Sequence, residues 1–215
     1  MSTPSISAYL TAVNTALSNL QADAALHTPL AAYGYDAAAI ADLITLYETA
    51  AATHFAQISQ YANTYGASAA YKTAYAAANT RYIRHLTLAR ILYEHEVGRR
   101  LQLGLSGRRP RSHDGWLLQA EQFYVPALNN PAIQAELATV GITLASLQEV
   151  REMVEGVAAA WYNQKTAAGI AQEATRTRNA ALQTLRHAYS NLFAVARIAF
   201  ADDLQKLERM GIVVK

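Results

Sequence analysis

Arginine is the residue type most concentrated in one part of this 215-residue chain. Eight arginines fall between positions 81 and 111, where the only acidic residues are Glu94 and Glu96. A guanidinium group binds phosphate or carboxylate oxygens through paired hydrogen bonds. The cluster therefore predicts a surface that binds nucleic acid, an acidic protein or a neighbouring subunit. Its candidate residues are Arg99, Arg100, Arg108, Arg109 and Arg111. The alternative is a solvated linker that keeps the chain soluble.

Histidines are the residues that could bind a metal ion or haem. A di-iron helical bundle uses Glu-x-x-His, and no glutamate stands three residues before His54, His85, His95 or His187. Two facing histidines could bind haem, and His54 and His85 would face each other if the chain turned back midway between them. A packed core position is the favoured interpretation of both. A haem- or metal-binding bundle is thus an alternative function, and no specific metal site is predicted.

Motifs for catalysis are missing from the sequence. We find no Gly-rich phosphate loop, no Gly-x-Ser-x-Gly turn and no His-Glu-x-x-His. The chain has no cysteine, which excludes disulfides, thiolate zinc sites and cysteine nucleophiles. His113 and Asp114 alone are too small a signal for acid–base chemistry. We therefore expect no enzymatic activity, no catalytic residue and no cofactor.

The composition favours a folded protein that associates with other proteins. Hydrophobic residues make up 52% of the chain, and only 16% of residues are charged, against roughly 25% in typical soluble domains. A weakly charged surface associates more readily than a heavily charged one. We expect a homo-oligomer or a protein partner. The formal net charge of +2 does not by itself indicate a nucleic-acid partner.

The chain carries no recognisable targeting signal. Its first twenty residues lack a basic segment followed by an apolar one, and no apolar run reaches the roughly 18 residues that span a bilayer. The expectation is a cytoplasmic protein that does not enter membranes.

A repeat with a period of 107 residues organises the sequence. The segment Ala89–Ile91 recurs at 196–198, Gly34 recurs as Gly141, and Gly104 recurs as Gly211. One spacing without gaps links both ends of the repeated unit, which indicates a tandem duplication. Helix-type apolar spacing and the lack of alternating apolar and polar residues predict an all-α fold. We expect a repeat unit at 1–105, an Arg-rich linker at 106–115 and a second repeat unit at 116–215.

Each repeat is expected to contain three main helices in an up–down bundle, and the two bundles are expected to pack together. In the first repeat, Thr3 and Pro4 begin one helix, Asp36 begins the second, and Gly66 ends it. The third then runs from about Ala67 to Leu103. In the second repeat, Pro126 should kink or break the first helix, Pro131 should start a short helix, and Thr143 should cap the next.

The repeat also singles out charged and aromatic residues. Glu48 recurs as Glu155 and Arg90 as Arg197, and a turn near Gly66 would bring Glu48 close to Arg90. A structural Glu–Arg pair in each repeat is one interpretation, and two solvated residues are the other. The residues Tyr71, Tyr82 and Tyr93 are spaced by eleven, so they share one helix face with Tyr75 beside them. Core packing is favoured for them, and a self-association surface is the alternative.

The favoured function from sequence alone is non-catalytic: a structural or interaction protein that assembles with itself or binds a protein partner. Nucleic-acid binding through residues 99–111 is the first alternative, and it is not favoured.

Overall fold

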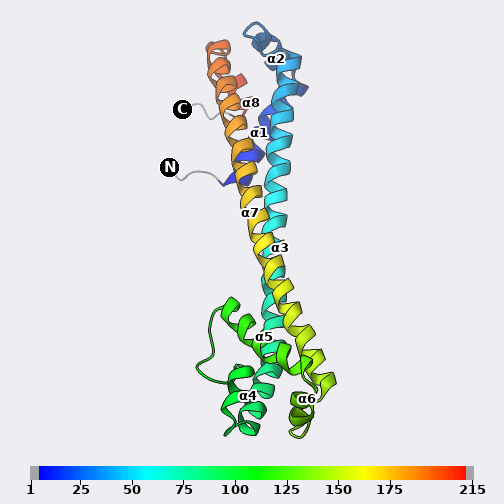
Figure 1. The fold of residues 1–215 in the computed structure, drawn as a ribbon. Coiled ribbons are helices and arrows are strands. Elements are labelled where there is room, and N and C mark those ends of the chain that lie inside the picture. Colours follow the sequence, from blue (N-terminus) through cyan, green and yellow to red (C-terminus); the bar gives the residue numbers. More distant parts are fainter. Residues whose placement is uncertain (1–4, 212–215) are drawn as a thin grey trace. The chain divides into compact units, whose positions relative to one another are not determined.

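The computed structural model describes residues 5–211, and in that part of the chain it contains eight helices and no strand (Figure 1). The predicted all-α class is confirmed. The helices are α1 (Ile6–Ala22), α2 (Ala24–Ala31), α3 (Ala37–Leu92), α4 (Val97–Gln102), α5 (His113–Asn129), α6 (Pro131–Ala138), α7 (Leu144–Ala199) and α8 (Leu204–Arg209). The predicted helix start at Thr3 and Pro4 lies outside the described residues. Ser5 caps α1 by accepting a hydrogen bond from the Ala8 amide.

The helix boundaries recur at the period of the sequence repeat. Helix α5 begins 113 − 6 = 107 residues after α1, and the same shift relates α6 to α2, α7 to α3 and α8 to α4 at both of their ends. The turns that follow recur as well, because Gly34 and Gly141 have φ angles of 85° and 82°. Glycine adopts this left-handed conformation at low cost, so it ends a helix at both places. Tandem duplication as the origin of the chain stays an interpretation.

The break predicted at Gly66 does not exist, because α3 is one continuous helix. Helix α3 runs for 56 residues through Gly66, and α7 runs for 56 residues through Gly169. A glycine inside a helix costs about 1 kcal/mol relative to alanine, and neither a proline nor a positive φ angle enforces a turn here. The predicted second and third helices are therefore one helix. It ends at Leu92, before the predicted end at Leu103, and the short helix α4 follows it.

Local capping signals in the sequence place the other boundaries. The Asp36 carboxylate accepts a hydrogen bond from the Ala39 amide at 2.9 Å, and the Thr143 hydroxyl accepts one from the Ser146 amide at 3.2 Å, so both predicted caps are confirmed. Pro131 begins α6 as predicted, after the N-cap Asn130.

Two boundaries around α5 differ from the expectation. The helix begins at His113, inside the predicted linker 106–115, because the Ser112 hydroxyl caps it. It then continues through Pro126 to Asn129, so of the predicted kink or break the break is wrong. Pro126 lies in the last turn, and because it has no N–H it removes one backbone hydrogen bond from the helix.

The chain forms two compact units, each of which contains segments of both sequence repeats. Unit 1 comprises the chain up to Tyr61 and from Ile170 onward, and unit 2 is Ala62–Gly169. Helices α1, α2 and α8 belong to unit 1, and helices α4, α5 and α6 belong to unit 2 (Figure 1). Each unit also takes one part of α3 and one part of α7. The repeats at 1–105 and 116–215 therefore both contribute to each unit.

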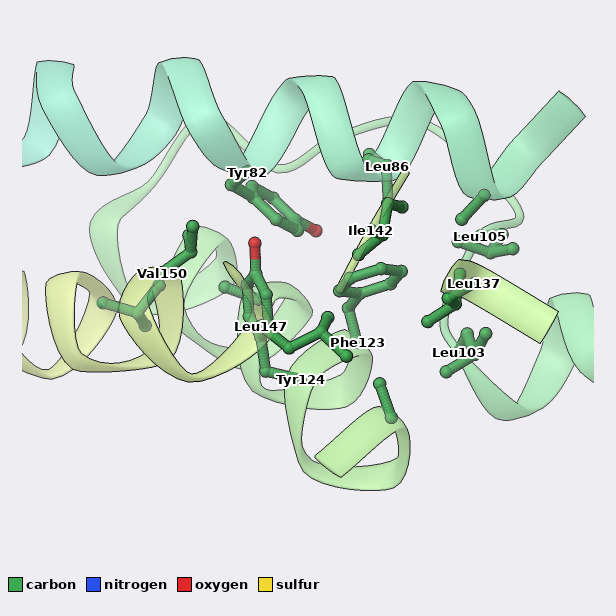
Figure 2. Packing of buried hydrophobic residues seen from close by; sticks show 14 of the residues in the cluster. Tyr82, Leu86, Leu103, Leu105, Phe123, Tyr124, Leu137, Ile142, Leu147 and Val150 are labelled. Atoms are coloured by element: carbon green, nitrogen blue, oxygen red, sulfur yellow. The ribbon is translucent and has the colours of Figure 1, made fainter. Parts of the chain in front are cut away.

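The core of unit 2 is formed by side chains from α3, α5, α6 and α7, together with the loop residues beside them. Figure 2 shows Tyr82 and Leu86 of α3 facing Phe123 and Tyr124 of α5. The Tyr82 ring lies 5.9 Å from the ring of Tyr124, measured between centroids. Aromatic rings of this size bury a large apolar area, so they supply much of the stabilisation of the unit.

Unit 1 has a core of its own, built at corresponding positions. Many positions that are buried in one unit are buried in the other at the shift of 107, including the pairs Leu30 and Leu137, Leu43 and Val150, Ala50 and Val157, Tyr82 and Tyr189, Ala89 and Ala196, Tyr93 and Phe200, and Leu103 and Met210. The two units therefore bury corresponding helix faces.

Candidate functional site

The predicted arginine cluster is divided by the structure into paired and unpaired residues. Arg99 of α4 donates a hydrogen bond to the Glu136 carboxylate at 2.6 Å, and the Tyr93 hydroxyl donates to the same carboxylate at 2.8 Å. The bond from Arg99, helped by that from Tyr93, holds the pKa of Glu136 below its usual value. Arg100 donates to the Glu94 carbonyl oxygen at 3.1 Å. Arg99 and Arg100 thus serve the internal structure of unit 2.

The other three predicted arginines remain free. Arg108, Arg109 and Arg111 lie exposed in the loop between α4 and α5, and none of their side chains forms an ion pair or a hydrogen bond with residues 5–211. They line a hollow of about 400 Å³ whose remaining wall is formed by Tyr75, Asn79, Pro110 and Trp116. None of the acidic side chains in the described part of the chain lines this hollow. This arginine hollow, defined by these seven residues, is the candidate binding site of unit 2.

Arg90 holds the backbone of the arginine-bearing loop. Its Nε atom donates to the Leu105 carbonyl oxygen at 2.8 Å, and its Nη2 atom donates to that of Gly107 at 3.5 Å. The loop returns to the start of α5 at Gly115, where an added Cβ would lie only 2.5 Å from Cβ of Pro110. Glycine is therefore required at position 115 for the loop to pack this closely.

The predicted Glu–Arg pairs are not formed. Glu48 and Arg90 both lie on the continuous helix α3, so the turn that would bring them together does not exist, and they belong to different units. Arg90 binds loop carbonyls instead. Glu155 and Arg197 both lie on α7, and Glu155 pairs with Arg151 at 3.2 Å. Both pairs are separated because α3 and α7 are each continuous over 56 residues.

The predicted tyrosine face packs into unit 2. Tyr82 and Tyr93 are 0% and 1% exposed, so they are core residues and cannot form a self-association surface. Tyr71 and Tyr75 are half-buried against the same core. The Tyr82 hydroxyl has no hydrogen-bond partner among residues 5–211, and burial raises the pKa of Tyr82 to about 12, although Arg90 and Arg109 oppose this rise.

Several residues beside the hollow were not predicted from the sequence. Trp116 donates its indole N–H to the Asn79 side-chain oxygen at 2.9 Å, and its ring lies 4.9 Å from that of Tyr75. His113 stacks on Trp161 with 4.4 Å between centroids, and its Nδ1 atom lies 3.2 Å from the Tyr71 hydroxyl. The two tryptophans are the sequence signal that could have identified these residues. The chain has only two, and both lie in this aromatic group.

The histidines do not form the site considered for haem. His54 and His85 lie on the same continuous helix and in different units, so the turn on which a facing pair depended is missing. His85 is 7% exposed, as its alignment with the core residue Leu192 suggests, and its Nδ1 atom lies 3.1 Å from the Tyr124 hydroxyl. Burial lowers the pKa of His85, Arg84 and Arg81 lower it further, and Glu149 raises it.

His85 also lines a cavity of about 460 Å³ with Thr80, Arg81, Arg84 and Ser146. The Arg81 guanidinium group forms an ion pair there with the Glu149 carboxylate, with 2.8 Å between Nη1 and Oε2. This cavity therefore offers less unpaired positive charge than the arginine hollow.

Within residues 5–211, no three His, Cys, Asp or Glu side chains are grouped so that they could hold a metal ion. No helix in the same range combines the length and the apolar character needed to cross a bilayer. No protein-family model matches the chain, and neither a curated protein nor a solved structure matches it. The chemistry that unit 2 offers is the binding of anions by unpaired guanidinium groups.

Proposed function

We propose that this protein is a non-catalytic helical assembly protein, which associates with further copies of itself through apolar positions that are repeated in its two units. One observation carries the proposal. Three positions are occupied by large, exposed apolar side chains in both units at the shift of 107: Phe55 and Tyr162, Ile91 and Ile198, and Val97 and Leu204. All six side chains are between 51% and 70% exposed.

These positions differ from ordinary surface residues because an exposed apolar side chain occurs at the same repeat position in both units. Single exposed apolar residues are common on soluble proteins and need no explanation. Leu118 is such a residue, because it is 69% exposed on α5 while its counterpart in unit 1 is the polar residue Thr11. A second copy of the chain presents the same apolar positions, so contacts between copies can be self-complementary. The low charge content of the chain favours such contacts.

Substitution of the repeated positions tests this proposal. We expect Val97→Gln combined with Leu204→Gln to weaken self-association at least tenfold, since burial of each large apolar side chain contributes roughly 1.5–3 kcal/mol. Phe55→Gln combined with Tyr162→Gln is expected to act in the same direction. Sedimentation equilibrium over a range of protein concentrations measures both effects.

The matched control is Leu118→Gln, which removes an equally exposed leucine outside the repeated set. It is expected to leave the association constant unchanged. If Leu118→Gln weakens association as much as the paired variants do, association depends on general surface hydrophobicity and the proposal fails.

The cytoplasmic location expected from the sequence belongs to this proposal as well, and fractionation of cells that express the native chain tests it. Recovery with the membrane fraction would contradict it.

A further inference from the structure

The loop that carries Arg108, Arg109 and Arg111 is held by contacts that do not use these three side chains. Arg90 binds the carbonyl oxygens of Leu105 and Gly107. At the other end of the loop, the Ser112 hydroxyl accepts a hydrogen bond from the Gly115 amide at 3.2 Å, and Pro110 packs against Gly115. The three guanidinium groups are therefore available to a ligand without loss of the contacts that order the loop.

The walls of the arginine hollow add neutral hydrogen-bond donors to these charges. The Asn79 side-chain oxygen accepts the Trp116 indole N–H, so its amide nitrogen is free to donate to a ligand. Tyr75 contributes a hydroxyl group to the same wall. No carboxylate of residues 5–211 lines the hollow or forms an ion pair with these arginines, so the three guanidinium groups are unpaired there.

We propose that the arginine hollow binds an oligophosphate, such as pyrophosphate or the phosphate chain of a nucleotide. A guanidinium group presents a planar fork of donors that matches phosphate oxygens, and three such groups match a ligand with several negative charges. A hollow of about 400 Å³ has room for a small ligand of this kind. This inference goes beyond the proposed self-association and does not depend on it.

The corresponding part of unit 1 lacks this chemistry among its described residues. The counterparts of Tyr75, Asn79 and Trp116 are Leu182, Arg186 and Tyr9. Arg186 lies over the Tyr9 ring, with 5.4 Å from its guanidinium carbon to the ring centroid. The proposed site therefore belongs to unit 2, and one ligand is expected per chain.

Isothermal titration calorimetry of the full chain with pyrophosphate, ATP, inorganic phosphate and a single-stranded oligonucleotide tests the proposal. We expect pyrophosphate and ATP to bind with one site per chain and more tightly than inorganic phosphate. Arg109→Ala and Arg111→Ala are each expected to weaken pyrophosphate binding about tenfold or more, because each removes charge-assisted hydrogen bonds. Binding is also expected to weaken as the salt concentration rises.

The control variant is Arg176→Ala, which removes one positive charge from an exposed position in unit 1. It is expected to leave pyrophosphate binding unchanged. Circular dichroism checks that each variant is folded, as expected because Arg109 and Arg111 form no bond with residues 5–211 and Arg176 forms only an exposed pair with Glu173.

Three outcomes would overturn the assignment. The first is no saturable binding of pyrophosphate or ATP at concentrations up to about 1 mM, where a specific site should be occupied. The second is equal loss of binding in Arg109→Ala and Arg176→Ala, which would indicate a general charge effect. The third is binding of the oligonucleotide alone, which would indicate an extended nucleic-acid surface and no oligophosphate site.

Discussion

The Nε atom of Arg90 lies 2.8 Å from the Leu105 carbonyl oxygen, so the end of the long helix α3 is tied directly to the loop that leads to α5. The loop and its three free arginines consequently have a defined position against Asn79 and Trp116. The sequence repeat drew attention to Arg90 for a different reason, as the partner of a glutamate. Its observed role is to hold backbone carbonyls.

Replacement of Arg90 should release this loop. We expect Arg90→Ala to lower the free energy of unfolding by about 1.5–3 kcal/mol, the usual range for hydrogen bonds made by charged groups. Trypsin should then cleave faster after Arg108 and Arg111, while Pro110 blocks cleavage after Arg109. Chemical denaturation and timed proteolysis measure the two effects. Arg176→Ala is the control, because its exposed pair with Glu173 contributes little. Equal behaviour of the two variants would contradict the role given to Arg90.

The continuity of α3 predicts opposite effects of alanine at two glycines. Gly66 lies inside the helix and an added Cβ meets nothing within 4 Å, so Gly66→Ala should raise the free energy of unfolding by about 0.5–1 kcal/mol. Gly34 has a φ angle of 85°, so Gly34→Ala should lower it by about 1 kcal/mol or more. Denaturant titration of both variants compares them. If Gly66→Ala instead lowers the free energy of unfolding, the result would contradict a continuous helix at Gly66 and support the break predicted from the sequence.

These two glycines also show how far the sequence could predict the fold. Helix ends at Gly34 and Gly141, and caps at Asp36 and Thr143, depend on neighbouring residues, so they were predictable. Whether a helix continues through Gly66 depends on the packing of residues distant in sequence, which repeats and spacing do not report.

The candidate site was predictable only in part, for the same reason. The sequence shows that Arg108, Arg109 and Arg111 are clustered, but the hollow exists because Trp116 meets Asn79, 37 residues earlier in the chain. Likewise, Arg99 differs from the three unpaired arginines because it forms an ion pair with Glu136 of α6. No local pattern indicates either contact.

His85 should make the stability of the protein sensitive to acid. Its pKa in the folded protein is below the unfolded value of about 6.5, so the unfolded state binds more protons between these two pKa values. The free energy of unfolding should therefore fall as the pH is lowered through about 6.5. The pKa of His113 is also lowered, chiefly by burial, and adds an effect of the same sign.

A double variant isolates the contribution of His85. His85→Leu with Tyr124→Phe removes both hydrogen-bonding partners, so no buried polar group is left unpaired. It should reduce the loss of stability between about pH 7 and 5, as measured by denaturation at each pH. His187→Gln, at an exposed position, is the control. An unchanged pH dependence in the double variant would show that His85 does not titrate as proposed.

The carboxylate of Glu136 should contribute stability at neutral pH. Its pKa is lowered in the folded protein, chiefly by the Arg99 hydrogen bond, so this stability is present above about pH 4.5 and is lost as the pH falls further. Glu136→Gln should lower the free energy of unfolding by about 1 kcal/mol at pH 7, because the pair is partly exposed. The difference from the native chain should shrink at pH 3. A difference that is the same at both pH values would contradict an ionic contribution.

The mass of the native particle in solution tests the proposed assembly most directly. We predict that sedimentation equilibrium will give a mass above that of one chain, and that this mass will rise with protein concentration until the assembly is complete. A mass equal to that of a single chain at every concentration, up to the highest that stays in solution, would contradict self-association through the repeated apolar positions.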